Sequence, residues 1–406
     1  MIELGIPMLL IVMDGLGDRP CRELGGITPL QAAYRPNMNS LIRRGLGGLM
    51  HSVSAGMTTG SDTSHLSLLG YDPVRFYSGR GPFEAMGLGL RLSGGDLAFR
   101  ANFATADSEG IVLDRRAGRL DEDASELADA LCMEMDGLSF QVKAGVEHRA
   151  ALVVKGDGLS DRITDTDPHS SGEKVKEVRA LDKEALFTAE VLNKYLAEAR
   201  SILGKHQFNL RRRENGKMPA NELLLRGAGL TPKLQPFREK YGFNGACIAG
   251  IPMVKGIGSL LGMKVLEVEG ATGTVNSNFR NKMDSAVEEM RNSQFVIVNI
   301  KGTDAAGHDG NAILKKRVIE RFDQALEPIM DLDVTVCITG DHSTPCDFRE
   351  HSGDPLPLLM SSPGSRRDGA KFFDEISCMN GSLRLGSGDI LQYMRQLSGN
   401  DEKYGA

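Results

Sequence analysis

Short apolar runs that alternate with helical patterns constrain the fold of this chain more than any other feature. The first run, Pro7 to Met13, stops abruptly at Asp14-Gly15, which is typical of a buried central strand. Further strand-like runs lie at 247–249, 264–268, 295–300 and 334–339, separated by helical patterns at 252–261, 279–290 and 312–330. This alternation predicts an α/β fold with a mostly parallel sheet that has helices on both faces.

The segment from residue 76 to residue 245 interrupts the alternation. It is richer in charge and carries strand-like pieces around one long helical pattern, Leu181 to Leu203. Because the βα pattern that precedes the segment resumes after it, we expect an inserted, smaller α/β domain at 76–245 and a core domain built from 1–75 and 246–406.

Composition excludes several classes of protein. The 406 residues include 48 Lys plus Arg against 54 Asp plus Glu, a net charge of −6, and there is no Trp. Basic runs are short and scattered, so we expect no nucleic-acid partner. No stretch of about 18 apolar residues is present, so we expect no membrane span. The six cysteines form no CxxC pair, which indicates reduced thiols and a cytoplasmic protein. The sequence leaves the oligomeric state open.

Acidic and histidine side chains directly follow several of the predicted strands. Asp14 ends the first strand, Asp304 and His308 follow a later one, and Asp341 and His342 follow another. Ligands of open α/β sheets bind beyond the carboxyl ends of the strands. We therefore expect these five side chains along one edge of the sheet.

Two further candidates are His351, ten residues after Asp341, and Ser61, at the start of a predicted helix. Taken singly, such residues have ordinary interpretations: Asp14 as a turn former, Asp341 and Ser61 as helix caps. Together, three carboxylates, three imidazoles and a hydroxyl are a ligand set for two divalent ions. Without ions the carboxylates would repel one another. With two divalent ions, a charge of +4 outweighs the −3 of the three carboxylates and leaves a positive pocket that suits phosphate.

Phosphoryl transfer is the chemistry that such a pocket predicts. A divalent ion lowers the pKa of a bound serine hydroxyl, and both ions stabilise a phosphoryl group displaced in line. Arginines would hold the rest of an anionic substrate, because the guanidinium group matches phosphate and carboxylate with two parallel hydrogen bonds. The candidates are Arg115, Arg116, Arg119 and Arg226, and the alternative for each is an ordinary solvated basic patch.

Several blocks of the sequence resemble the archaeal type of cofactor-independent phosphoglycerate mutase, a family of the alkaline phosphatase superfamily. The blocks are Met13 to Pro20, Gly60 to Ser67, Gly70 to Pro73, Asp114 to Arg119, Thr303 to Asp309 and Thr339 to Cys346. The likeness runs essentially from end to end. One departure is Ser64, where the family pattern leads us to expect Ala between Thr63 and His65.

The resemblance implies a role for each candidate. Ser61 would be the phosphorylated nucleophile, and two divalent ions (Mn, Zn, Co or Mg) would be bound without any need for 2,3-bisphosphoglycerate. One ion would be held by Asp14, Ser61, Asp341 and His342, and the other by Asp304, His308 and His351. The substrate-binding residues would be Arg115, Arg116, Arg119, Arg226 and Lys255. The resemblance also implies that 1–75 and 246–406 are a metal-binding, phosphatase-like core and that 76–245 is a substrate-binding lid. The role of His65 stays open.

We therefore predict an enzyme of glycolysis and gluconeogenesis that interconverts 2-phosphoglycerate and 3-phosphoglycerate through a phosphoserine on Ser61. One alternative is a metal-dependent phosphomonoesterase, or a mutase for another sugar phosphate, on the same metal centre. Another is a catalytically inactive metal- or phosphate-binding protein, since a fold alone does not determine activity. An inserted domain that carries arginines favours the mutase, because such a domain excludes water when it closes.

Overall fold

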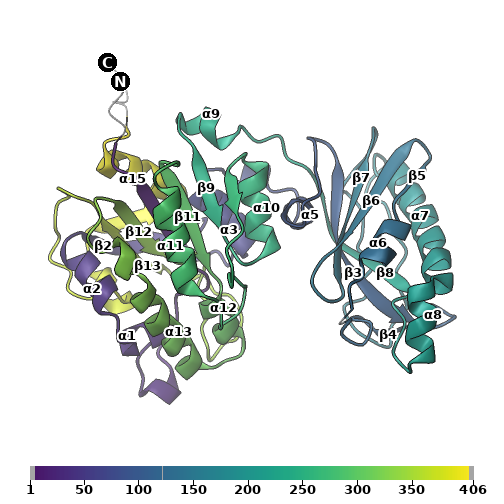
Figure 1. Ribbon diagram of the computed structural model, residues 1–406, viewed down its shortest axis with the longest axis horizontal. Helices are drawn as coiled ribbons and strands as arrows, with labels where there is room; N and C mark the ends of the chain where they lie inside the picture. The colour runs from purple at the N-terminus through teal and green to yellow at the C-terminus, as the bar shows by residue number, and fades with distance from the viewer. Residues whose placement is uncertain (1–4, 121, 402–406) are drawn as a thin grey trace. The chain divides into compact units, whose positions relative to one another are not determined.

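The apolar run at the start of the chain forms β1 (Met8–Met13), whose six residues are all buried. The computed structural model describes residues 5–120 and 122–401. In it, β1 lies inside an eight-stranded sheet with the order β10-β9-β11-β1-β12-β13-β2-β14 (Figure 1). Its neighbours β11 (Phe295–Ile300) and β12 (Thr335–Thr339) both run parallel to it. These three strands therefore end at the same edge of the sheet.

The remaining strands extend this sheet on either side. Parallel pairs join β9 to β10 and to β11, and join β2 to β14. Only β13 runs antiparallel to its two neighbours among the described strands of this sheet. The bounds are β2 (Leu46–His51), β9 (Gly245–Ile248), β10 (Lys264–Leu266), β13 (Leu356–Ser361) and β14 (Leu383–Gly386). The predicted α/β fold with a mostly parallel sheet is confirmed.

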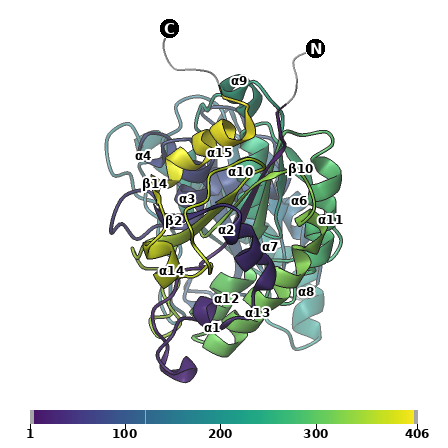
Figure 2. The ribbon, with the colours of Figure 1, turned by 90° about the vertical axis from the view of Figure 1, so that its left-hand side faces the viewer.

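Helices cover both faces of the sheet (Figure 1, Figure 2). On one face, Leu9, Ile11 and Met13 of β1 belong to a core cluster with side chains of α2 (Pro36–Arg43), α11 (Phe279–Glu289) and α13 (Ala312–Ala325). On the other face lies α10 (Pro252–Leu260). Its Gly258 is so close to Cys247 of β9 that a side chain at this position would have no room. There α3 (Ser61–Leu68) contacts α10, and α15 (Ile390–Ser398) contacts β1 and β12. Burial on both faces explains why β1 contains no polar residue.

The short helices of this part of the chain are α1 (Pro29–Ala32), α4 (Pro73–Phe76), α9 (Phe237–Tyr241), α12 (Gly302–His308) and α14 (Glu375–Met379). No helix among the described residues is long and apolar enough to cross a membrane. All six cysteines are unpaired.

The chain divides into two compact units, one formed by Met1–Phe76 with Gln235–Ala406 and the other by Tyr77–Leu234. The second unit has a separate sheet, with the order β4-β3-β7-β6-β5 and β8 paired to β3, in which all described pairs are antiparallel. Its strands are β3 (Leu97–Ala106), β4 (Val112–Asp114), β5 (Met133–Met135), β6 (Leu138–Ala144), β7 (Arg149–Lys155) and β8 (Glu222–Leu230). Its helices are α5 (Gly81–Gly87), α6 (Ser125–Ala130), α7 (Leu186–Lys205) and α8 (Gln207–Glu214).

The second boundary between the units lies after residue 234, whereas we expected it after residue 245. Residues 235–245 pack with the first unit: the ring of Phe237 stacks on Phe295 of β11, with ring centroids 5.3 Å apart. The Phe237 N–H donates to the carbonyl of Leu261, and the Tyr241 hydroxyl donates to the carbonyl of Leu69. Aromatic packing on the sheet therefore assigns this segment to the first unit.

One buried charge lies between α11 and the sheet. Lys282 has no exposed surface, and its Nζ donates to the carbonyl oxygen of Asn299 in β11 at 2.9 Å. Burial lowers the pKa of Lys282 to about 8. At neutral pH the folded chain therefore keeps an ammonium group in a place that disfavours charge.

We predict that Lys282→Met raises the unfolding temperature at pH 7 and loses this advantage near pH 10. Between about pH 8 and pH 10.4 the unfolded chain keeps a proton that the folded wild type has already released, so wild-type stability rises with pH by on the order of 3 kcal/mol. The variant lacks this contribution. Thermal unfolding at the two pH values checks this, with the more exposed Lys316→Met as control. An equal loss of stability at both pH values would contradict it.

Candidate metal centre

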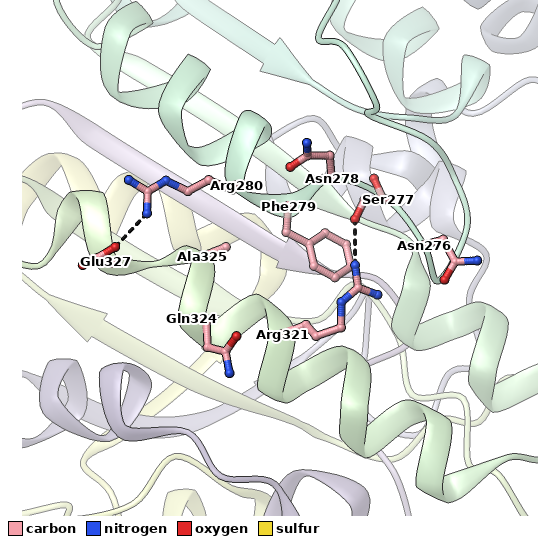
Figure 3. A pocket seen from close by; sticks show the side chains of 9 residues that line it. All are labelled: Asn276, Ser277, Asn278, Phe279, Arg280, Arg321, Gln324, Ala325 and Glu327. Atoms are coloured by element: carbon pink, nitrogen blue, oxygen red, sulfur yellow. Dashed lines mark hydrogen bonds and ion pairs between the residues drawn. The ribbon is translucent and has the colours of Figure 1, made fainter.

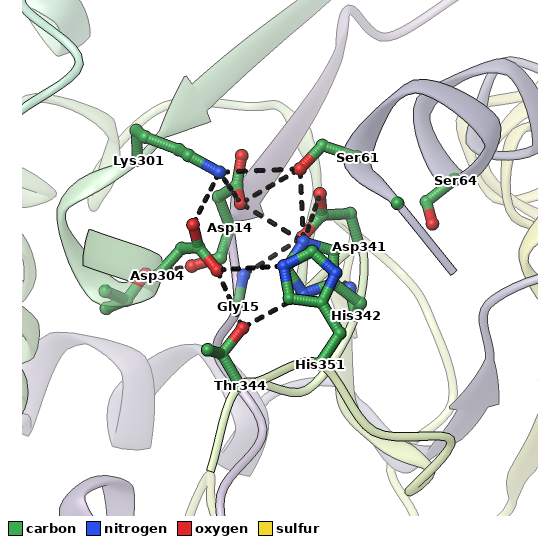
Figure 4. A network of polar contacts seen from close by, with 12 residues as sticks. Asp14, Gly15, Ser61, Ser64, Lys301, Asp304, Asp341, His342, Thr344 and His351 are labelled. Carbon is green, nitrogen blue, oxygen red and sulfur yellow. Dashed lines mark hydrogen bonds and ion pairs between the residues drawn. The ribbon is translucent and has the colours of Figure 1, made fainter. Parts of the chain in front are cut away.

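All seven predicted ligand residues lie in the first unit. Figure 4 labels six of them, all except His308, at one edge of the sheet. Asp14 follows β1, Asp304 and His308 lie in α12 just after β11, and Asp341 and His342 follow β12. Because these three strands are parallel neighbours, their ends bring the five residues together. Ser61 is the first residue of α3, and His351 lies in the loop before β13.

One group of potential ligands surrounds the Nε2 atom of His342. Ser61 Oγ lies 3.1 Å from this nitrogen, Asp341 Oδ2 lies 3.4 Å from it and Asp14 Oδ1 lies 3.5 Å from it. Ligand atoms that each lie 2.0–2.2 Å from a tetrahedral ion are separated by roughly 3.4 Å from one another. Asp341 Oδ2 is buried and has no hydrogen-bond partner among the described residues. A buried carboxylate oxygen without a donor, facing three other ligand atoms, fits a metal ion.

A second group consists of Asp304, His308 and His351. The two Nε2 atoms are 3.2 Å apart, and each lies 3.5 Å from Asp304 Oδ1. The Nδ1 atom of His308 bonds to the carbonyl of Arg349, and that of His351 bonds to the carbonyl of Thr59. A carbonyl accepts only from a protonated nitrogen, so both Nε2 lone pairs face Asp304 and are free to bind a cation.

Thr344 connects the two groups and was not found from the sequence. Its hydroxyl donates to Asp304 Oδ1 at 2.7 Å and lies 3.1 Å from His342 Nδ1. Since the hydroxyl proton is directed at Asp304, the Thr344 oxygen accepts from His342, and the His342 Nε2 lone pair faces the first group. The threonine therefore orients one candidate ligand of each group, Asp304 and His342.

Lys301 is a second residue that the sequence analysis missed. Its Nζ donates to Asp14 Oδ1 at 2.8 Å, pairs with Asp304 Oδ2 at 2.6 Å and lies 3.5 Å from Ser61 Oγ. Burial alone would raise the pKa values of both carboxyls. For Asp14 the Lys301 ammonium outweighs burial. For Asp304 the neighbouring His351 side chain and then Lys301 outweigh it, so both pKa values lie well below the usual range. The position of Lys301 directly after a strand was the available signal.

His65, whose role was open, lies next to Ser61, the predicted nucleophile. Its Nδ1 is 2.7 Å from the carbonyl oxygen of Ser61, and its Nε2 is 3.2 Å from the amide nitrogen of Asn299. The same Asn299 amide donates to Asp14 Oδ2 at 3.0 Å. His65 is therefore protonated on Nδ1 and accepts on Nε2, which makes it a positioning residue that connects Ser61 to Asp14 through Asn299.

Ser64, the departure from the family pattern, supports the backbone of Asp341, a candidate ligand, through Ser52. Its Oγ lies 2.7 Å from Ser52 Oγ, which donates to the carbonyl of Asp341 at 2.6 Å. The side chain of Ser64 points away from the ligand atoms (Figure 4). The additional hydroxyl is thus hydrogen-bonded and leaves the ligand set unchanged.

The predicted substrate-binding arginines lie in the second unit. Arg115 forms two hydrogen bonds to Asp167, at 2.9 and 2.6 Å, and Arg226 Nη1 lies 4.0 Å from the same carboxylate. Arg226 Nε is buried and has no hydrogen-bond partner among the described residues. Arg116 and Arg119 are exposed in the turn after β4. Asp167 was not predicted from the sequence, and it orients the two arginines that are partly buried.

Lys255 does not join the metal-ligand residues through any contact that the structure describes. It lies on α10 in the first unit, and its Nζ bonds to both carboxylate oxygens of Glu267, at 2.7 and 2.6 Å. The charge of this lysine is thus already paired.

A surface pocket of about 560 Å³ lies between α11 and α13, away from all of these residues (Figure 3). Arg321 there donates to the carbonyls of Val275 and Ser277, and Arg280 pairs with Glu327. Both arginines are thus already bonded within the chain, and we assign this pocket no function.

Comparisons with known proteins point to one family. A sequence model described as "2,3-bisphosphoglycerate-independent phosphoglycerate mutase" matches residues 43–209. Curated proteins of the same name from Thermoplasma volcanium and Thermoplasma acidophilum are 51% and 53% identical over 401 residues, covering 98% of this chain and 98% and 99% of theirs.

Two solved structures resemble the whole chain. The cofactor-independent phosphoglycerate mutase of Thermoplasma acidophilum has a TM-score of 0.76 at 47% identity, covering 97% of this chain and 100% of that one. A protein from Pyrococcus horikoshii has a TM-score of 0.86 at 38% identity, covering 99% and 100%.

We predict that the wild type, after treatment with a chelator, binds two equivalents of Mn²⁺ and that His351→Ala binds one. The variant removes one of the three ligands of the second group and leaves the first group intact. Bound metal is measured by elemental analysis after gel filtration. Asp309→Asn, an exposed carboxylate next to His308, is the control and should bind two. Two equivalents in His351→Ala would contradict the assignment.

Proposed function

The chain belongs to the family of 2,3-bisphosphoglycerate-independent phosphoglycerate mutases, and we propose that it interconverts 2-phosphoglycerate and 3-phosphoglycerate through a phosphoserine on Ser61. The observation that carries the proposal is the environment of Ser61 Oγ. This atom lies 3.1 Å from His342 Nε2, 3.3 Å from Asp14 Oδ1 and 3.5 Å from Lys301 Nζ. A hydroxyl at the start of a helix, among metal-ligand types and an ammonium, is suited to receive a phosphoryl group.

Two divalent ions complete this site in the proposal. Asp14, Ser61, Asp341 and His342 would hold one ion, and Asp304, His308 and His351 would hold the other; these oxygen and nitrogen donors suit Mn, Zn, Co or Mg. When bound, the ions lower the pKa of the Ser61 hydroxyl and stabilise the charge of the transferring phosphoryl group. The unpartnered Asp341 Oδ2 and the three Nε2 lone pairs support this assignment.

The reaction divides into two half-reactions of the same kind. Ser61 donates a hydrogen bond to Asp14 Oδ1, which orients its Oγ lone pairs. In the first half, a bond forms between Oγ and phosphorus while the bond from phosphorus to the glycerate oxygen breaks. The proton lost from Ser61 ends on that glycerate oxygen. The second half reverses these steps on the other hydroxyl, so the substrate supplies its own phosphoryl group and no 2,3-bisphosphoglycerate is needed.

The second unit would bind the glycerate through its arginines. Arg226 has a buried Nε without a described partner, and Asp167 holds Arg115 in a fixed orientation. A pair of preoriented guanidinium groups suits the carboxylate of a phosphoglycerate. Arg116 and Arg119, exposed in the turn nearby, would add positive charge, and this unit would act as a substrate-binding lid. A role for Lys255 has no support beyond the sequence motif, because Glu267 pairs with it.

We predict that the wild type equilibrates 3-phosphoglycerate with 2-phosphoglycerate without added 2,3-bisphosphoglycerate and with little release of inorganic phosphate. Ser61→Ala should abolish the exchange, because it removes the group shared by both half-reactions. Phosphorus NMR follows all three species together. Ser67→Ala, another hydroxyl of α3, is the control and should stay active. Phosphate that appears as fast as 2-phosphoglycerate would instead identify a phosphomonoesterase.

We also predict that Arg226→Ala weakens the binding of glycerate. KM for 3-phosphoglycerate should rise about 10-fold or more, and phosphate release per turnover should increase. While glycerate stays bound, its hydroxyl competes with water at an effective concentration of about 10⁵ to 10⁸ M. The matched control is Arg162→Ala, an exposed arginine of the same unit that pairs with Asp182. A variant with unchanged KM and unchanged phosphate release would rule out this role for Arg226.

A further inference from the structure

Lys301 lies at the point where the two groups of potential metal ligands meet. It is the first residue after β11 and precedes α12, the helix that carries Asp304. Its side chain is 20% exposed, so the ammonium group is mostly surrounded by protein. Figure 4 shows it directed toward Asp14, Asp304 and Ser61. Ser61 is the proposed nucleophile. Asp14 belongs with it to the first group of potential ligands, and Asp304 belongs to the second.

We propose that Lys301 is a catalytic residue whose ammonium group binds an oxygen of the phosphoryl group carried by Ser61. This inference rests on the proposed phosphoserine at Ser61. The distance of 3.5 Å between Lys301 Nζ and Ser61 Oγ is the observation that carries it. A phosphoryl group attached to Oγ adds oxygens around that atom, within reach of the same ammonium group.

The hydrogen bonds of Asp304 leave room for Lys301 beside a bound ion. Oδ2 of Asp304 pairs with Lys301, whereas Oδ1 faces the Nε2 atoms of His308 and His351. The lysine thus uses the carboxylate oxygen that the second ligand group does not use. At Asp14, Oδ1 accepts from Lys301 while Oδ2 is bonded to Asn299. Lys301 therefore holds the two carboxylates in place: it shares Asp14 Oδ1 with the first group and leaves the atoms of the second group uncovered.

The charge of the site supports the same role. Asp14, Asp304 and Asp341 contribute −3 and two divalent ions would contribute +4, which leaves +1. The Lys301 ammonium raises this sum to +2, which matches the charge of about −1.5 to −2 that a phosphoryl monoester carries at neutral pH. Without Lys301 the phosphoserine would keep an unbalanced negative charge in a site where little water screens it.

A lysine suits this position better than an arginine. Its compact ammonium group has three donors, and three acceptor groups surround it, namely Asp14, Asp304 and Ser61. A planar guanidinium group spreads its donors over a wider fork and would not meet three oxygens that converge on one point. The geometry therefore predicts that Lys301→Arg restores only part of the function.

The test compares Lys301→Met, Lys301→Arg and the wild type, with Lys316→Met as control. Lys316 pairs with Glu320 on α13, outside the site. Each protein is loaded with Mn²⁺ and its metal content is measured. The dissociation constant for inorganic phosphate, used as the probe, is then determined by isothermal titration calorimetry. Initial rates with 3-phosphoglycerate give kcat and KM.

We expect Lys301→Met to keep both ions and to bind inorganic phosphate about 10- to 100-fold more weakly. Its kcat should fall about 10²- to 10³-fold, and Lys301→Arg should lie between it and the wild type. A Lys301→Met protein that keeps both ions and binds phosphate like the wild type overturns the proposal. So does one that loses an ion, because Lys301 would then only hold the ligands in place. A wild type that binds phosphate yet forms no 2-phosphoglycerate would contradict the proposed function instead. The dissociation constants for phosphate of the wild type and Lys301→Met would still show whether Lys301 binds the phosphoryl group.

Discussion

Three buried carboxylates at one edge of the sheet are the constraint on which the rest of this structure depends. Asp14 and Asp341 have no exposed surface and Asp304 has 3%. Negative charges this close repel one another, and burial weakens the screening that water would provide. Their ionised state therefore requires positive charge and hydrogen-bond donors directed at them. The side chains that surround the site supply both.

The donors are arranged so that part of each carboxylate stays available. The backbone N–H groups of Gly15 and His342 donate to Asp341 Oδ1 and leave Oδ2 without a described partner. Backbone carbonyls and a threonine hydroxyl bind the Nδ1 atoms of the three histidines, so the opposite nitrogens face the carboxylates. For the proposed divalent ions this arrangement would lower the cost of binding, because the candidate ligands are already oriented.

The sequence was sufficient to predict the sheet and the gathering of the candidate ligand residues at one of its edges. Asp14, Asp304 and Asp341 follow apolar runs, and the carboxyl ends of parallel strands share one edge, so their proximity follows from the fold class. Thr344 was missed because its role depends on where its side chain points, which no local pattern encodes. Lys301 directly follows β11, but this position alone does not show that its ammonium group meets Asp14 and Asp304. Lys255 was assigned from a motif alone, and the structure pairs it with Glu267. The second domain boundary was misplaced because the stacking of Phe237 on Phe295 joins segments far apart in the chain.

Anomalous X-ray diffraction from crystals grown with Mn²⁺ shows whether the seven candidate ligand residues form two cation sites beside Ser61. We expect two anomalous peaks, one among Asp14, Ser61, Asp341 and His342 and one among Asp304, His308 and His351. Two ions in sites of this kind lie about 3.5 to 4 Å apart. A single peak, or Mn²⁺ bound only elsewhere on the chain, would rule out a two-ion site at this edge of the sheet.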